Sequence, residues 1–250
     1  MAKCISELKP EKTTDCALII GSGASLDELP YIAISNLFQK SAYVIVMNDT
    51  WILPDIAYDF TINHHTVKDM PDWYIEKYQN HINENPWKHV HPVYDCNNPF
   101  RGITQYTGDF WQYNGYAVCE TTNLYVDPLI YPDPSHLFVG GSILFDAIGL
   151  AHRLGCKNLF FMGVDGGKVN GNAYCEEYRK LWPQDEYYVV GHSHRTMASL
   201  LPFIEWAKPK GWTFTNLSQR MGNEWPISGE NEKNAHTDRL SFRVIEHAPY

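Results

Sequence analysis

The stretch GGSILFDAIGLAHRLGCKNLFFMGVD, residues 140–165, decides the fold. After Gly-Gly-Ser it continues in apolar residues at helical spacing as far as Arg153, and Gly155 then closes the predicted helix. Leu159–Met162 is a short apolar run of the kind that forms a buried strand. The run ends in Gly163-Val164-Asp165, so the stretch predicts a helix, a strand and a polar loop in direct succession.

Further segments of strand and helix length lie on both sides of this stretch. Strands are predicted at Ala17–Ile20, Ala42–Met47, Ile56–Ile62, His89–Tyr94 and Trp212–Thr215, and helices at Asp72–Asn83 and Thr196–Ala207. The alternation of strands and helices is typical of an α/β fold, with a mostly parallel sheet and helices on both faces. We expect one domain over residues 1–250.

The segment from about residue 96 to residue 135 differs from its surroundings. It is rich in Asn, Gly, Pro, Thr and aromatic residues and has no clear periodicity. Long irregular segments in compact domains usually serve a function. The sequence therefore predicts a small irregular lid or insertion here, over the site.

Composition restricts the class of function. The chain of 250 residues is 44% hydrophobic and 20% charged, as in packed globular proteins. No apolar run approaches the roughly 20 residues that a membrane-spanning helix needs, and residues 1–15 lack the apolar core of a secretory signal. The net charge of −9 makes a nucleic acid the less favoured partner.

The six cysteines are scattered along the chain. They form no C-x-x-C pair, which argues against a structural zinc site. Reduced thiols and a cytoplasmic location are therefore expected.

Three predicted strands end in residues that suit nucleotide binding. Gly21-Ser22-Gly23-Ala24-Ser25 fits phosphate contact, because glycines let a ligand approach the backbone; a tight turn without a ligand explains it about as well. Asn48 fits a hydrogen bond to a base or ribose, or a simple turn. Asp165 fits ribose hydroxyls, because parallel sheets bind ligands at such strand ends.

A second candidate segment is Gly191-His192-Ser193-His194. It fits a catalytic base, a metal pair or a solvated loop, and His64-His65 would be the further metal ligands. The chain has no D-x-D arrangement, which many metal-dependent nucleotide-sugar transferases use to hold a divalent ion. Its absence favours a mechanism without metal.

Together these motifs resemble a known superfamily. The matching residues are Ile19–Leu26, Asn48, Gly140–Asp165, Tyr174, Gly191–Ser193 and Thr215–Ser218. The chain is similar to the bacterial sialyltransferases of glycosyltransferase family 42. It is also similar to the MptE-like domains of motility-associated factors and archaeal pterin diphosphokinases. The resemblance implies a Rossmann-like sheet with a small lid.

The resemblance also implies roles for individual residues. The nucleotide-binding residues would be Gly21, Ser22, Gly23, Ser25, Asn48, Gly141, Ser142, Gly163 and Asp165. His192 would be the general base, and Tyr174 would bind the leaving phosphate. A second phosphate-binding tyrosine of that family has no counterpart here, and Lys168 stands near its position.

The implied reaction is metal-independent sugar transfer from a nucleotide-activated donor, most plausibly a CMP-sugar, to an acceptor hydroxyl. No cofactor is expected beyond the nucleotide-sugar co-substrate, and a homo-oligomer is suggested. Two alternatives stay open. One is a diphosphokinase that uses ATP and magnesium held by Asp165 and Asp49. The other is a nucleotide-binding protein without catalysis.

Overall fold

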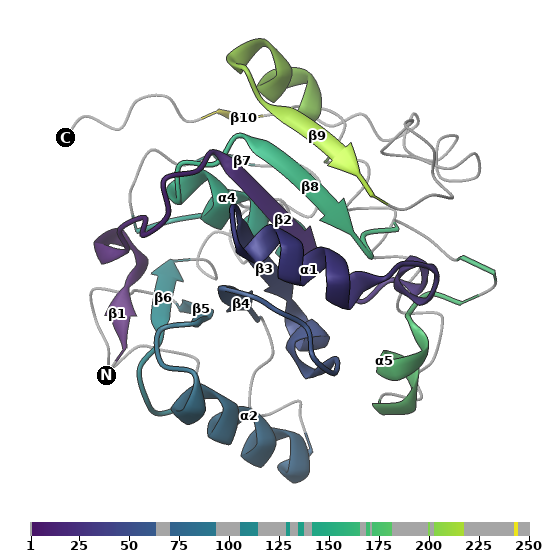
Figure 1. Ribbon diagram of the computed structural model, residues 1–250. Coiled ribbons are helices and arrows are strands. Elements are labelled where there is room, and N and C mark those ends of the chain that lie inside the picture. Colours follow the sequence, from purple (N-terminus) through teal and green to yellow (C-terminus); the bar gives the residue numbers. More distant parts are fainter. Residues whose placement is uncertain are drawn as a thin grey trace.

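The computed structural model describes residues 2–63, 71–93, 106–114, 129–130, 135–137, 142–165, 169–170, 172–181, 200, 203–217 and 243–244. Within these ranges, eight strands form one sheet in which every neighbouring pair runs parallel (Figure 1). Their order across the sheet is β1-β6-β5-β4-β3-β2-β8-β9. The strands are β1 (Lys3–Cys4), β2 (Cys16–Ile20), β3 (Tyr43–Met47), β4 (Phe60–Ile62), β5 (His89–Val93), β6 (Trp111–Asn114), β8 (Asn158–Met162) and β9 (Thr213–Asn216).

Helices and several short 3-10 turns accompany the sheet; besides the four helices whose bounds follow, residues 203–207 are helical, within the helix predicted at Thr196–Ala207. The helices are α1 (Tyr31–Gln39), α2 (Asp72–Glu84), α4 (Ile143–Arg153) and α5 (Glu176–Leu181). The 3-10 turns are η1 (Ile5–Glu7), η2 (Ala24–Glu28), η3 (Asn48–Ile52) and η6 (Lys208–Lys210). A separate pair of short parallel strands joins β7 (Leu129–Ile130) to β10 (Arg243–Val244). Among the described helices, none is long and apolar enough to cross a bilayer.

The two faces of the sheet are covered by different helices. Leu18 and Ile20 of β2 belong to a buried cluster that includes α2 and packs against α1. Ala17 and Ile19 point the other way, into a cluster built on α4. Figure 1 shows α1 in front of the sheet and α4 behind it. This alternation confirms the predicted α/β, Rossmann-like sheet with helices on both faces.

The connections define a switch point in the sheet. From β2 the chain passes to β3, β4 and β5 on one side, and later to β8 and β9 on the other. Open parallel sheets bind ligands beyond the carboxyl ends of their strands, at the place where the order reverses. The fold therefore directs attention to the loops after β2 and β8.

One prediction about the irregular segment is wrong. Residues 96–135 were expected to lie outside the sheet, but Trp111–Asn114 is β6, between β5 and β1. Its sequence, WQYN, contains the strand formers Trp and Tyr, but four residues are too short to stand out as a strand within an irregular segment. Pairing with β5 and β1 on its two sides makes it part of the sheet. Apart from residues 106–114, 129–130 and 135, this segment lies outside the described residues.

The cysteines also depart from the prediction at one place. Cys4 is disulfide-bonded, so the expectation of reduced thiols throughout is wrong there. Cys16, Cys156 and Cys175 are free. Burial raises the pKa of Cys156 to about 12 and that of Cys175 to about 11, so both remain unreactive thiols near neutral pH.

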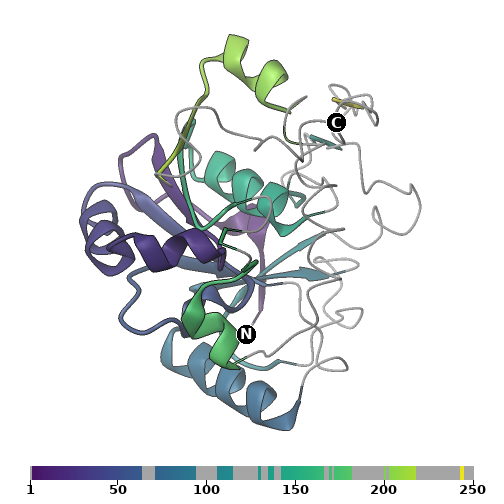
Figure 2. The same cartoon turned by 90° about the vertical axis from the view of Figure 1, so that its right-hand side faces the viewer.

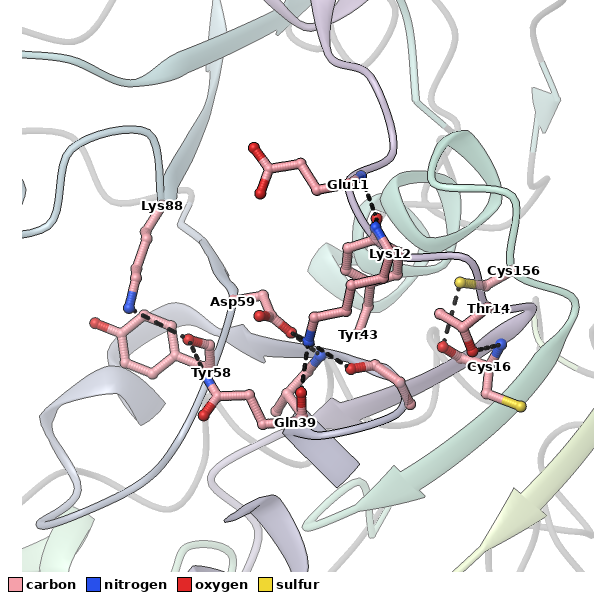
Figure 3. Close-up of polar contacts among 12 residues, drawn as sticks. Glu11, Lys12, Thr14, Cys16, Gln39, Tyr43, Tyr58, Asp59, Lys88 and Cys156 are labelled. Atoms are coloured by element: carbon pink, nitrogen blue, oxygen red, sulfur yellow. Dashed lines mark hydrogen bonds and ion pairs between the residues drawn. The ribbon is translucent and has the colours of Figure 1, made fainter. Parts of the chain in front are cut away.

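Lys12 forms hydrogen bonds to three segments at the amino end of the sheet (Figure 3). Its ammonium donates to the carbonyl oxygens of Gln39 and Ala42, both at 2.8 Å, and to the carboxylate of Asp59 at 2.7 Å. The same carboxylate accepts the N–H of Val44 at 2.8 Å. One partly exposed cation therefore joins the end of α1 to the beginnings of β3 and β4.

A chain of hydrogen-bonded rings fills the space between α2 and the sheet. The hydroxyl of Tyr78 lies 3.1 Å from Nδ1 of His89 and 3.1 Å from Nε2 of His91. His81 Nδ1 lies 3.0 Å from His89 Nε2, and the hydroxyl of Tyr58 lies 2.6 Å from His81 Nε2. Burial lowers the pKa of His81 to about 4 and that of His89 well below its usual value. Both imidazoles are therefore neutral at pH 7.

This cluster predicts a loss of stability in mild acid. Unfolded histidine binds a proton below pH 6.5, whereas folded His81 does so only near pH 4. The free energy of unfolding should therefore fall as the pH drops from 6.5 towards 4. The slope is about 1.4 kcal/mol per pH unit for each such histidine. Urea unfolding at pH 7, 6 and 5 measures it, and His81→Asn should give a shallower slope. Equal stability at pH 7 and pH 5 would contradict the prediction.

Candidate functional site

Two glycine turns meet at the switch point. The turn after β2 begins at Gly21 and the turn after β8 begins at Gly163. Gly21 donates its N–H to Met162 O and Gly23 donates its N–H to Gly163 O, both at 2.9 Å. A Cβ on Gly23 would lie 2.6 Å from the carbonyl oxygen of Gly163, and a Cβ on Gly163 would overlap the carbonyl oxygen of Gly21. These glycines are therefore required by backbone packing between the two turns.

Ser25 and Asp165 lock the turns together. The N–H of Ser25 donates to Oδ2 of Asp165 at 2.8 Å, and its hydroxyl donates to Oδ1. Both side chains are buried. Burial raises the pKa of Asp165, while the two hydrogen bonds from Ser25 oppose that rise. The pair therefore holds the two glycine turns in a fixed relative position.

Asn48 occupies the end of the neighbouring strand. It is the first residue of η3, directly after β3, and its φ of 49° lies in the left-handed region. Asparagine tolerates that conformation better than most residues with a side chain. Asn48 is half-buried at the carboxyl edge of the sheet.

Tyr174 lies beside the first glycine turn. Its backbone forms an antiparallel bridge with Gly23, and the N–H of Cys175 donates to Ser22 O at 2.9 Å. The ring of Tyr174 packs against Tyr178 of α5, with centroids 4.6 Å apart. Figure 1 shows α5 at the end of the sheet to which the arrowheads of β8 and β9 point. The structure thus brings Tyr174 to the same edge as Gly21–Ser25.

Ser142 is the N-cap of α4. Its hydroxyl accepts the N–H of Leu144 at 3.3 Å, which satisfies one of the free donors of the helix start. A helix that leads into a parallel strand runs opposite to it, so this cap belongs to the carboxyl edge of the sheet. Capping alone accounts for a serine at this position.

The remaining predicted residues lie outside the part of the chain that the structure describes. They are Gly141, His192 and the further candidates His64, His65, Lys168 and His194. The general base and the metal-pair interpretation of Gly191–His194 therefore stay predictions. Among the described residues, no group of three or more His, Cys, Asp or Glu side chains is arranged to hold a metal ion.

The described site residues divide into two layers. Ser22, Asn48, Ser142 and Tyr174 are half-buried, whereas Gly21, Gly23, Ser25, Gly163 and Asp165 are buried. The half-buried group offers hydroxyl, amide and phenol groups to a ligand. The buried group holds the loops in place beneath them. Such an edge suits a polar ligand that is bound by neutral hydrogen-bonding groups.

Two residues of this region were not predicted as nucleotide-site residues. Asp49 is 1% exposed and accepts hydrogen bonds from the hydroxyls of Tyr74 and Tyr178. Asp49 directly follows the strand-end Asn48, and Tyr178 lies four residues after Tyr174. The strand-end position was the signal for Asp49, which the sequence suggested only as a magnesium ligand. No sequence signal indicated Tyr178, because Tyr174 lies before α5 and the two residues do not share a helix.

Comparisons with known proteins find similarity to solved structures, at low sequence identity. No protein-family model matches the chain, and no curated protein sequence does. The MAf glycosyltransferase from Magnetospirillum magneticum AMB-1 has a TM-score of 0.49 and 15% identity, over 90% of this chain and 37% of that one. The sialyltransferase CstII from Campylobacter jejuni, in complex with the substrate analogue CMP-3FNeuAc, has a TM-score of 0.39 and 16% identity. That match covers 82% of each chain. Neither likeness assigns a role to a residue of this chain.

The packing of the turns predicts a large effect of Gly163→Ala. Gly163 has φ 65° and Gly155 has φ 88°, so alanine is strained at both positions. A Cβ meets nothing within 4 Å at Gly155, but it meets the other turn at Gly163. Gly155→Ala should therefore cost about 1 kcal/mol of unfolding free energy. Gly163→Ala should cost about 1–3 kcal/mol more, because the turns must move apart. Urea unfolding compares the two, and equal losses would contradict the contact.

Proposed function

We propose that this chain is a metal-independent glycosyltransferase that moves a sugar from a nucleotide-activated donor to an acceptor hydroxyl. The observation that carries the proposal is the meeting of Gly21–Ser25, Asn48, Gly163–Asp165 and Tyr174 at the carboxyl edge of the sheet. That is the place where open parallel sheets bind nucleotides. The choice of a CMP-sugar rests on the motif resemblance in the sequence.

The proposed donor lies across the switch point. The side chains of Asn48 and Ser22, both half-buried residues, would contact the nucleoside. The phenol of Tyr174 would donate to the phosphate, since it is half-buried and its backbone is paired with Gly23. The buried pair Ser25–Asp165 would act indirectly, by holding the two glycine turns in place.

In this proposal His192 takes the proton of the acceptor hydroxyl. The acceptor oxygen then forms a bond to the anomeric carbon as the bond from that carbon to the phosphate breaks. The electron pair leaves with the nucleotide, whose growing negative charge Tyr174 stabilises by hydrogen bonding. The nucleotide-sugar and the acceptor are the only reactants, so the reaction as written needs no cofactor.

The diphosphokinase alternative is less well supported by the geometry. It would need Asp49 and Asp165 as magnesium ligands. The carboxylate of Asp165 accepts two hydrogen bonds from Ser25, and that of Asp49 accepts them from Tyr74 and Tyr178. Magnesium would have to replace these donors at two buried positions, at the cost of the contacts that fix the site.

Nucleotide binding tests the class of donor. Thermal unfolding should be measured with CMP, UDP, ADP and ATP, each with and without magnesium. We expect CMP to raise the Tm without magnesium, because a ligand that binds only the folded protein stabilises it by about 2.7 kcal/mol at 100 times its Kd. Stabilisation by ATP with magnesium alone would replace this proposal with the diphosphokinase. Stabilisation by CMP without any turnover of CMP-sugars would indicate a binding protein.

The base assignment is tested by His192→Ala. Transfer should fall about 10²–10⁴-fold while the affinity for CMP stays within about twofold, because a general base acts on the acceptor rather than on the nucleotide. His236→Ala removes a histidine that no motif assigns to the site; it is the control and should keep the parental rate. Parental transfer by the His192 variant would refute the assignment.

A further inference from the structure

A buried carboxylate connects the site to two helices. Asp49 is 1% exposed and follows Asn48 at the end of β3. Its Oδ1 accepts the hydroxyl of Tyr74, from α2, and its Oδ2 accepts the hydroxyl of Tyr178, from α5, at 3.3 Å. Asn63 at the end of β4 donates to the hydroxyl of Tyr74 at 3.1 Å. Asp49 thus ties α2 and α5 to the carboxyl edge of the sheet; in the view of Figure 2, α5 (green) is drawn above α2 (blue).

The ring of Tyr178 also packs against the ring of Tyr174. Their rings are 4.6 Å apart and tilted by 32°. The backbone of Tyr174 is held separately, by the bridge to Gly23 and by the Cys175 N–H on Ser22. The glycine turn therefore fixes where Tyr174 leaves the chain, and Tyr178 fixes where its ring lies.

The helix that carries Tyr178 cannot hold this position unaided. α5 spans only Glu176–Leu181, and helices of that length are marginal without tertiary contacts. Asp27 anchors the helix start, because its carboxylate accepts the N–H of Glu176 at 2.9 Å and lies 3.7 Å from the guanidinium of Arg179. The buried residue of α5 is Tyr178, whose hydroxyl donates to Asp49. Loss of the Asp49 bond would therefore leave the first turn in place and loosen the ring of Tyr178, against which Tyr174 packs.

The hydrogen bonds to Asp49 persist over the working pH range. Burial raises the pKa of Tyr178 and that of Tyr74 well above the usual value for tyrosine, so both hydroxyls remain protonated donors. A buried carboxylate is costly unless it is hydrogen-bonded, and an apolar residue would fill the same space without that cost. A carboxylate at this point is therefore best explained by the geometry that it imposes on its donors.

We propose that Asp49 is a positioning residue that sets the ring of Tyr174 for the donor phosphate, acting through Tyr178. The placement of Tyr174 follows from the contacts alone. Its consequence for the phosphate rests on the proposed function.

Hydrogen exchange tests the positioning without any ligand. The amide of Arg179 donates to Cys175 O at 3.0 Å, in the turn of α5 that carries Tyr178. In Asp49→Asn, and in Tyr178→Phe, this amide should exchange about 10-fold faster, because loss of one hydrogen bond makes local opening of the turn easier. Asp59→Asn is the matched control: Asp59 also accepts two donors, Lys12 and Val44, but at the amino end of the sheet. It should leave the exchange of Arg179 unchanged. Unchanged exchange at Arg179 in both test variants would overturn the positioning role.

Binding of CMP and cytidine tests the consequence. Asp49→Asn and Tyr178→Phe should weaken CMP about 10-fold and leave cytidine unchanged, because only CMP carries the phosphate. Tyr174→Phe should show the same selectivity, and adding Asp49→Asn to it should cause no further loss. Equal weakening of both ligands, or additive losses, would overturn the proposal. If the parental protein binds neither ligand, the proposed function fails, while the exchange of Arg179 still decides the positioning.

Discussion

The contact between the two glycine turns is the constraint on which the rest of the site depends. β2 and β8 pair in register along their whole length, and the pairing continues beyond the strands through Gly21 and Gly23. Because no Cβ intervenes, the two loops leave the sheet side by side and Ser25 can reach Asp165. Side chains at the glycine positions would separate the loops. Tyr174 is paired with the first turn and would move with it.

The two ends of the sheet use polar groups for different purposes. At the amino end, Lys12 and Asp59 form a partly exposed ion pair that joins strands and a helix end. At the carboxyl end, Asp49 and Asp165 are buried and accept hydrogen bonds only from neutral donors in the contacts described above. Exposed pairs contribute little and tolerate rearrangement, whereas buried carboxylates demand fixed partners. The side chains around Asp49 and Asp165, at the carboxyl end, are therefore held in more strictly defined positions than those around Lys12.

The sequence predicted those elements whose form is set locally. β2, β3, β8, α2 and α4 follow from apolar runs, helical spacing and the closing Gly155. β6 and β1 were missed because they become strands only by pairing with each other and with β5. The strand-end rule found Asn48 and Asp165, but it could not show that Asp165 bonds to Ser25. Asp49 and Tyr178 lie 129 residues apart, and no local pattern announces their contact.

α2 links the candidate site to the interior. Tyr74 and Tyr78 lie one turn apart on its buried side, with rings stacked at 5.8 Å, and His81 continues the same face. Tyr74 donates to Asp49, while Tyr78 and His81 belong to the ring cluster with His89. The helix is therefore held by hydrogen-bonded rings that need specific partners more than by interchangeable aliphatic packing. A substitution that loosens this face of α2 would therefore weaken the hydrogen bond to Asp49. Through Tyr178 it would also change the position of the Tyr174 ring, although neither Asp49 nor Tyr174 is itself substituted.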